Sequence, residues 1–365
     1  MRAGSFVTFV LLAACSSKPA LPVAGDAAVP GGPDTGPPAG CLHWCASPPC
    51  ALAQGEFPFR IAVDGEWVYF TARGWSTRGG GELVDAGPPV EPTGAVLRVS
   101  KQGGAAATVL AAGQNFPGYL AVDAEAVYWT VLGDNAVHRV GKDGSNPLTL
   151  ASASNIVMPD ALALGERDVY FSALERSGPG GIYRVPKQGG AAPVPVVYST
   201  AVKGLTVDET DVYFTIYGMS TYEDGAVRKV PRGGGPIINL ATNENSPWPI
   251  VLHGDRVFWA NYGLTTPGSA IKSARRDGTD QRVLVQVAGT GHGPPDLVLD
   301  GDEIFWVEND GAAGAVRRAR ADGGEVRTLA TMQDGPNGIA VDRCTVYWST
   351  IGRRGQPGVV WAMPR

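Results

Sequence analysis

The stretch VDETDVYFT, residues 207–215, recurs with small changes along the whole chain. Its other copies begin at Val63, Val122, Leu164, Leu252, Leu299 and Val341. Successive copies are 59, 42, 43, 45, 47 and 42 residues apart. A repeat of about 40–50 residues is typical of one four-stranded propeller blade. The spacing therefore predicts seven similar blades.

Each repeat also carries three further parts in a fixed order. In the first unit, the VYF strand is followed by GAVLRVSK (94–101), a Gln-Gly-Gly turn and TVLAAG (108–113). Gly-rich pairs suit tight hairpin turns, because these turns need positive φ. We therefore expect four antiparallel strands, A to D, in every unit.

The VYF or VYW run places three bulky residues in succession, whereas a half-buried strand alternates. Blades of a propeller stack face to face, so their middle strands are buried on both sides. We therefore assign these aromatic residues to packing between blades.

The two ends of the chain share one blade in this scheme. The last unit ends at Arg365 after its third strand, and a fourth-strand pattern occurs instead at Ala51–Gln54. The sequence thus predicts an all-β, seven-bladed propeller of four-stranded antiparallel blades, closed by an N-terminal strand in the last blade.

The first 40 residues differ from the rest. Residues 1–14 have a basic start and a short apolar run, and the segment Leu12-Ala13-Ala14-Cys15 resembles a bacterial lipobox. This resemblance implies a signal peptide over 1–14 and a lipid on Cys15, which would anchor the protein to a membrane. Residues 16–40 are rich in Pro, Gly and Ala and are expected to form a disordered tether before a domain at 41–365.

The repeats resemble the YWTD and NHL propeller repeats, and Val127-Tyr-Trp-Thr130 is nearly a YWTD motif. The resemblance covers about residues 50–365 and is closest to propeller lipoproteins of bacteria, of the myxobacterial type. Two departures are the seven units, where those rings usually have six, and the missing final Asp, for example at Val131. The resemblance implies the fold, not a ligand.

Four cysteines remain after Cys15: Cys41, Cys45, Cys50 and Cys344. Every complete pairing ties Cys344 to the N-terminal cluster. Cys50 and Cys344 are expected two to three strand spacings apart, too far for one bond. We therefore expect Cys41 or Cys45 to be the partner of Cys344. The alternative is a metal site formed by Cys41, His43, Cys45 and Cys50, although their spacing matches no zinc pattern.

Motifs of common enzymes are absent: the sequence has no G-x-S-x-G, P-loop, H-E-x-x-H or EF-hand. We therefore expect no catalytic function, cofactor or metal. The alternative is a metal-dependent hydrolase or lactonase with calcium or another metal in the central channel. Its candidate ligands are Asp160, Asp296, Glu308 and Asn337.

Loop lengths distinguish the two faces of the expected disc. The A–B and C–D turns are short, and their basic residues Lys101, Lys142, Lys187 and Arg232 are expected to be solvated. The B–C and D–A loops on the other face vary, as binding loops on a rigid scaffold do. Candidate binding residues on that face are Trp75, Arg78, Tyr217, Tyr222, Trp248, Tyr262, His292 and Glu308.

The net charge is −5 and basic residues are dispersed, which argues against nucleic-acid binding. We expect a monomeric, non-catalytic binding or scaffold module of the bacterial cell envelope, with a protein or glycan partner. Ser16 after Cys15 favours the outer membrane, with the domain facing the periplasm or the cell surface.

Overall fold

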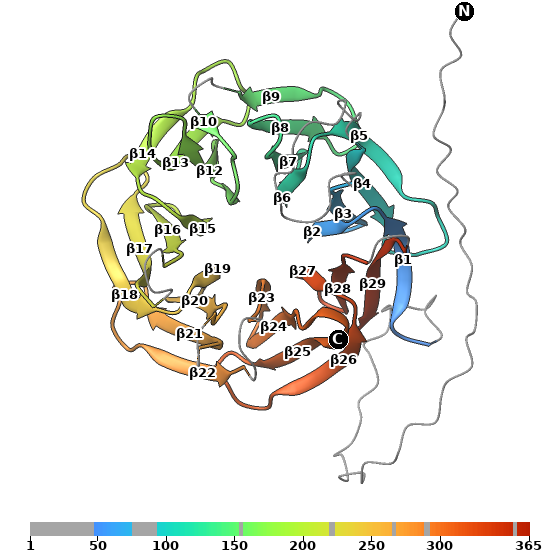
Figure 1. Cartoon of the computed structure of the whole chain (residues 1–365). Coiled ribbons are helices and arrows are strands. Elements are labelled where there is room, and N and C mark those ends of the chain that lie inside the picture. Colours follow the sequence, from blue (N-terminus) through green and yellow to red (C-terminus); the bar gives the residue numbers. More distant parts are fainter. Residues whose placement is uncertain are drawn as a thin grey trace, which may run out of the picture.

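The computed structural model describes residues 47–74, 93–152, 156–218, 223–264, 268–287, 293–352 and 356–365. Seven antiparallel sheets are arranged around a central axis, with their first strands innermost (Figure 1). This confirms the predicted seven-bladed propeller. No helix among these residues is long and apolar enough to cross a membrane.

The strands of the blades follow the order of the chain, apart from β1. The first two blades are β2 (Pro58–Val63), β3 (Trp67–Ala72), β4 (Gly94–Ser100), β5 (Thr108–Gln114), and β6 (Pro117–Val122), β7 (Ala126–Val131), β8 (Ala136–Gly141), β9 (Leu148–Ala151). The third blade has a divided first strand: β10 (Ile156–Val157), β11 (Leu162–Leu164), β12 (Asp168–Glu175), β13 (Gly178–Pro186), β14 (Val194–Tyr198).

The remaining blades repeat the pattern. The fourth and fifth are β15 (Val202–Val207), β16 (Asp211–Ile216), β17 (Gly225–Pro231), β18 (Ile238–Glu244), and β19 (Pro247–His253), β20 (Arg256–Asn261), β21 (Ala270–Arg275), β22 (Arg282–Gln286). The sixth is β23 (Asp296–Asp300), β24 (Glu303–Glu308), a short 3-10 helix η1 (Gly311–Ala313), β25 (Gly314–Arg320) and β26 (Arg327–Gln333). The seventh is β27 (Pro336–Val341), β28 (Thr345–Thr350) and β29 (Gly358–Pro364), completed by β1 (Cys50–Gly55).

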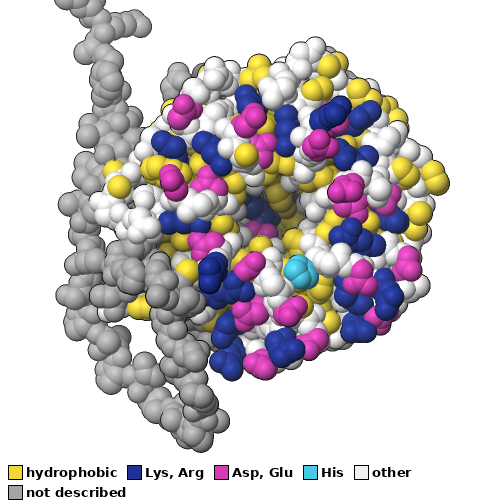
Figure 2. Space-filling view, turned by 180° about the vertical axis from the view of Figure 1, so that it is seen from behind, with side chains coloured by type: hydrophobic (Ala, Val, Ile, Leu, Met, Phe, Trp, Pro, Cys, Tyr) yellow, Lys and Arg dark blue, Asp and Glu magenta, His cyan; other side chains and the backbone are white. Residues whose placement is uncertain are grey.

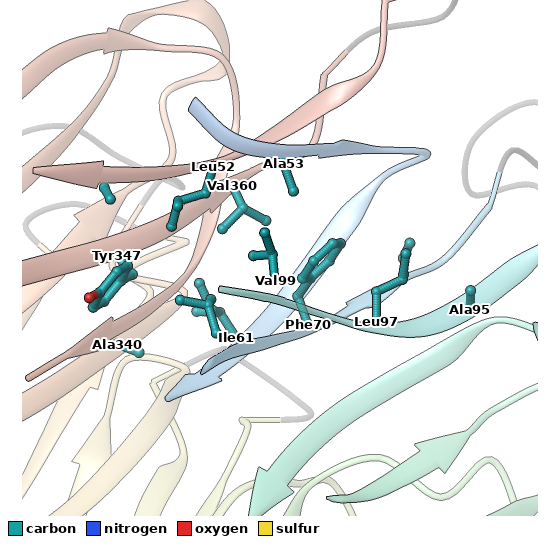
Figure 3. Packing of buried hydrophobic residues seen from close by; sticks show 13 residues of the cluster. Leu52, Ala53, Ile61, Phe70, Ala95, Leu97, Val99, Ala340, Tyr347 and Val360 are labelled. Carbon is teal, nitrogen blue, oxygen red and sulfur yellow. The ribbon is translucent and has the colours of Figure 1, made fainter. Parts of the chain in front are cut away.

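The N-terminal strand closes the ring as predicted. β1 pairs antiparallel with β29, with Ala51 opposite Trp361 and Gln54 opposite Val359. Leu52 and Val360 belong to one buried cluster with Phe70 of the first blade (Figure 3). The two ends of the chain therefore share one hydrophobic core.

The aromatic run of the second strand packs on both faces of its blade. Tyr69 and Phe70 are neighbours with 0 % exposure, yet they belong to different hydrophobic clusters. Tyr69 packs toward the second blade, with Trp129, whereas Phe70 packs toward the seventh. Because neighbouring strand residues point to opposite faces, a continuous apolar run is required here.

The hydroxyl that ends the repeated phrase links adjacent blades. Thr71 Oγ1 accepts the amide proton of Arg60 within its blade and donates to the carbonyl of Gly118 in the next. The same bonds to the next blade are made by Thr130, Thr215 and Ser349. The final Thr or Ser of the repeat thus satisfies backbone groups that face the axis.

A second link, which we call the turn clip, joins the A–B turn of one blade to a basic residue of the next. The carboxylate of Asp64 accepts the Tyr69 hydroxyl at 2.9 Å and lies 2.9 Å from Lys142 Nζ. Equivalent clips are Asp123–Lys187, Asp208–Arg276, Asp300–Arg365 and Asp342–Lys101, and Arg232 bonds the hydroxyl of Tyr170 where Gly165 replaces the Asp.

The expectation that the turn lysines are merely solvated is therefore wrong. Lys101 is only 8 % exposed, and its ammonium lies 2.5 Å from Asp342. Although burial alone would raise the pKa of Asp64, the bonds from Lys142, two backbone amides and Tyr69 lower it to about 2. These basic residues hold the ring together.

Candidate recognition site at the channel mouth

The innermost strands begin on the face that carries the B–C and D–A loops, and their first residues surround the channel mouth. Figure 2 shows the opposite face of the disc, which carries the A–B turns, with basic and acidic side chains interspersed around the central hollow. The polar side chains of the channel stand one or two residues before the repeated Ile or Leu of the inner strands, at a position that varies between blades. These are Arg60, Tyr119, Asp160, Lys203, Trp248 and Asp296.

Arg60 of β2 reaches from the first blade to the sixth and seventh. Its Nη1 donates to the carbonyls of Pro295, at 3.1 Å, and Asn337, at 3.5 Å. The same nitrogen lies 3.2 Å from Oδ2 of Asp296. Only 4 % of Arg60 is exposed, whereas 22 % of the Asp296 side chain is, so this ion pair is largely but not fully buried.

The Tyr119 hydroxyl joins four blades. It accepts hydrogen bonds from Nη2 of Arg60 at 2.8 Å and from Nε1 of Trp248 at 3.0 Å. It donates a hydrogen bond to the backbone carbonyl of Lys203 at 3.2 Å. The Arg60 guanidinium also lies 4.2 Å from the centre of the Tyr119 ring, where a cation–π contact is favourable.

A second ion pair completes the ring of contacts. Nζ of Lys203 lies 3.1 Å from Oδ2 of Asp160, which comes from the third blade. Lys203 also lies 5.8 Å from the centre of the Trp248 ring. Arg73, directly after β3, has its guanidinium 3.2 Å from the centre of the Phe59 ring and 4.4 Å from that of Phe116.

Burial and the neighbouring charges together set the pKa values of this cluster. Burial raises the pKa of Asp296, and the charge of Arg60 and two backbone amides oppose that rise. Burial likewise raises the pKa of the Tyr119 hydroxyl, so it stays a protonated donor at neutral pH. Burial alone would lower the pKa of Lys203, but Asp160 raises it above the usual value. The cluster is therefore a set of paired charges.

Three predicted binding residues come together beside this cluster. The rings of Trp248 and Tyr262 are 5.1 Å apart and inclined by 55°, and all three of Trp248, Tyr262 and Tyr217 are partly exposed. Burial raises the pKa of Tyr262, and nearby Tyr217 raises it further. The fourth and fifth blades thus present an aromatic group next to the channel.

The other predicted binding residues are not part of this group. Trp75, Arg78, Tyr222 and His292 lie outside the described residues. Glu308, at the end of β24, is bound within its own blade: it accepts from Nε of Arg317 and from Nε1 of Trp306, each at 2.8 Å.

The candidate metal ligands do not converge. Asp160 pairs with Lys203, Asp296 pairs with Arg60, and Glu308 pairs with Arg317. Asn337 offers its carbonyl to Arg60, while its buried Oδ1 has no hydrogen-bond partner within the described residues. In that part of the chain, no three His, Cys, Asp or Glu side chains are grouped as a metal site. These four candidate ligands are therefore not arranged as one metal site.

Sequence reasoning missed Arg60, Tyr119 and Lys203. A signal existed at the start of the inner strands. Arg60 and Tyr119 stand directly before the repeated Ile or Leu of their units, and Lys203 stands two residues before it. Polar or aromatic residues at the inward position of a propeller's first strand are the pattern to look for.

The chain is similar in fold to several solved structures, although no family model and no curated protein sequence matches it. A streptogramin B lyase has 12% identity and a TM-score of 0.63, over 85% of this chain and 94% of that one. An oligogalacturonate lyase in complex with manganese has 12% identity and a TM-score of 0.62, over 86% and 91%. A puromycin-hydrolyzing peptidase from Mycobacterium tuberculosis has 14% identity and a TM-score of 0.62, over 86% of this chain but 53% of that one. At these identities the similarity shows the propeller fold alone.

Proposed function

We propose that this protein is a non-catalytic binding module of the bacterial cell envelope, which recognises a protein or glycan partner at the channel mouth. The observation that carries the proposal is the contact between Trp248 and Tyr262, two partly exposed aromatic residues from one blade beside the mouth. Tyr and Trp dominate binding hot spots, because they bury a large area while losing little conformational freedom.

The paired charges support a binding role over catalysis. A general base or nucleophile needs a reactive group poised for proton transfer. Here Asp296 and Asp160 are each neutralised by a cation, and the Tyr119 hydroxyl already has three partners. These contacts make a rigid base on which exposed aromatic groups are held in place.

The anchoring belongs to the same proposal. We infer a lipid on Cys15 and a tether over residues 16–40, which would leave the propeller free to meet a partner near the membrane. Cys50 begins β1 and Cys344 lies in the β27–β28 turn, so disulfides from these residues to Cys41 and Cys45 would fix the closing strand. Cys41 and Cys45 lie outside the described residues, so these disulfides are part of the proposal.

The test is direct binding of detergent-solubilised envelope material to the immobilised protein. Trp248→Ala and Tyr262→Ala should reduce the signal, whereas Tyr198→Ala should leave it unchanged. Tyr198 is a matched control, because it is an aromatic residue with 55% exposure on the outer strand β14.

The metal-dependent hydrolase is tested separately by elemental analysis of the purified protein. We expect no stoichiometric calcium, manganese or zinc. A stoichiometric metal that is lost on Asp296→Asn or on Asn337→Ala would replace the binding proposal with the enzyme.

A further inference from the structure

The turn clip is missing at one blade interface, between the fifth and sixth blades. Three replacements coincide there: His253 stands in place of the turn Asp, Phe258 in place of the Tyr, and Ala321 in place of the Lys or Arg. At each of the other six interfaces, a basic side chain of the later blade reaches the earlier one.

The backbone around Ala321 is that of the other blades. Its amide donates to the carbonyl of Asp302 at 2.7 Å, as the amide of Lys101 donates to Glu66 at 3.0 Å and that of Arg276 to Asp255 at 3.1 Å. Only the long side chain is lacking. The interface therefore keeps the shape that receives a lysine in other blades.

A cavity of about 350 Å³ lies at this interface. Phe258, Leu284 and Ala321 contribute apolar surface to it, and Asp255 and Asp302 contribute carboxylates. His253, Ser273 and three arginines also line it. It is large enough for an alkyl chain with a charged end.

The arginines that line this cavity already have carboxylate partners. Arg256 and Arg282 both bind Asp280, and Arg320 lies near Asp322 and Glu325. By contrast, the exposed side chains of Asp255 and Asp302 make no hydrogen bond or ion pair within the described residues. A positively charged group would find two available carboxylates.

We propose that this cavity, the empty clip, binds an external organic cation: the ammonium or guanidinium end of an alkyl chain, from a partner's Lys or Arg or from a free amine. The turn clips of the other blades show how a cation is placed beside an aromatic ring at this position. Lys101, Lys187, Arg232 and Arg365 place their cations 5.0–5.7 Å from the ring centres of Tyr347, Tyr128, Tyr170 and Phe305. Phe258 offers the corresponding ring here, with the cation supplied from outside.

The test uses the full-length protein and three probes followed by NMR shifts: n-butylamine, the capped peptide acetyl-Gly-Lys-Gly-amide, and neutral n-butanol. We expect saturable binding of n-butylamine and at least 10-fold weaker binding of n-butanol. Saturable peptide binding would identify a protein lysine as the source. Binding of n-butylamine without the peptide would identify a free amine. Equal binding of n-butanol and n-butylamine would overturn the proposal.

Two variants locate the site. Ala321→Lys should supply the missing cation from the chain itself and weaken the binding of n-butylamine at least 10-fold. Asp302→Asn should weaken this binding at least 5-fold without filling the cavity. Asp143→Asn, in an exposed turn of the second blade, is the control and should leave binding unchanged. Wild-type affinity in both Asp302→Asn and a folded Ala321→Lys would overturn the proposal, and Asp302→Asn decides alone if Ala321→Lys does not fold.

Discussion

Nη2 of Arg60 lies 2.8 Å from the hydroxyl of Tyr119, and through these two residues six of the seven blades are in contact at the channel. Arg60 reaches the sixth and seventh blades, and Tyr119 reaches the fourth and fifth. The third blade joins through the ion pair of Asp160 with Lys203. The channel thus contains a continuous polar network that supports the mouth from below.

Arg60→Met should destabilise the propeller by about 3 kcal/mol, because it leaves the largely buried carboxylate of Asp296 without its cation. The double variant Arg60→Met/Asp296→Leu should recover part of the loss. Chemical denaturation measures both. Arg98→Met is the control, since Arg98 also stacks on a ring, that of Trp67, but away from the channel. A loss below about 1 kcal/mol in Arg60→Met would mean that the network does not stabilise the ring.

The turn clips should make the propeller sensitive to acid. The folded pKa of Asp64, about 2, is below the usual value of 3.8, so its contribution is present above pH 4 and is lost as pH falls toward 2. Asp64→Asn should remove about 2 kcal/mol at neutral pH and flatten the stability profile between pH 4 and 2. Thermal melting across this range measures it. Asp255→Asn, in the fifth blade's turn, should change neither the stability at neutral pH nor its dependence on pH. An unchanged dependence of stability on pH in Asp64→Asn would contradict the clip.

Deleting residues 41–56 should open the ring. The deletion removes β1, including Leu52, and exposes the partner edge of β29 together with the core around Val360. We expect a much lower melting temperature and loss of cooperative unfolding. A truncated protein that melts like the full-length chain would show that the closing strand is dispensable.

Cys15→Ser should release the protein from membranes into the soluble fraction, because the lipid would no longer be attached. Fractionation with mass spectrometry of the N-terminal peptide measures this. Unchanged membrane partitioning, together with a native peptide that carries no lipid mass, would contradict the anchor.

The repeat made most of the fold predictable. Tyr69 and Phe70 could be placed between blades from their succession alone, and Ala51–Gln54 could be placed in the last blade because Arg365 ends a unit one strand short. The first inference depends on the order of residues within one strand, and the second depends on the number of strands that each unit needs. Both can be seen in the sequence itself.

The channel network and the clips were not predictable in the same way. Arg60 and Tyr119 are 59 residues apart, and Arg60 and Pro295 are 235 apart, so only the curvature of the ring brings them together. Lys142 was expected to be solvated because its partner, Asp64, belongs to the preceding blade. Contacts between repeats depend on how the blades stack, which the residues of a single repeat do not reveal.

The most direct test of the proposed function compares three variants in binding to solubilised envelope material by surface plasmon resonance. Trp248→Ala and Tyr262→Ala should each weaken binding by about 2 kcal/mol, roughly 30-fold, because they remove aromatic hot spots at the mouth. Tyr262→Ala should do so with melting nearly unchanged, because Tyr262 is not part of the channel network. Tyr198→Ala on the outer rim should bind like the wild type. Wild-type binding by both mouth variants, with a loss in Tyr198→Ala, would contradict recognition at the channel mouth.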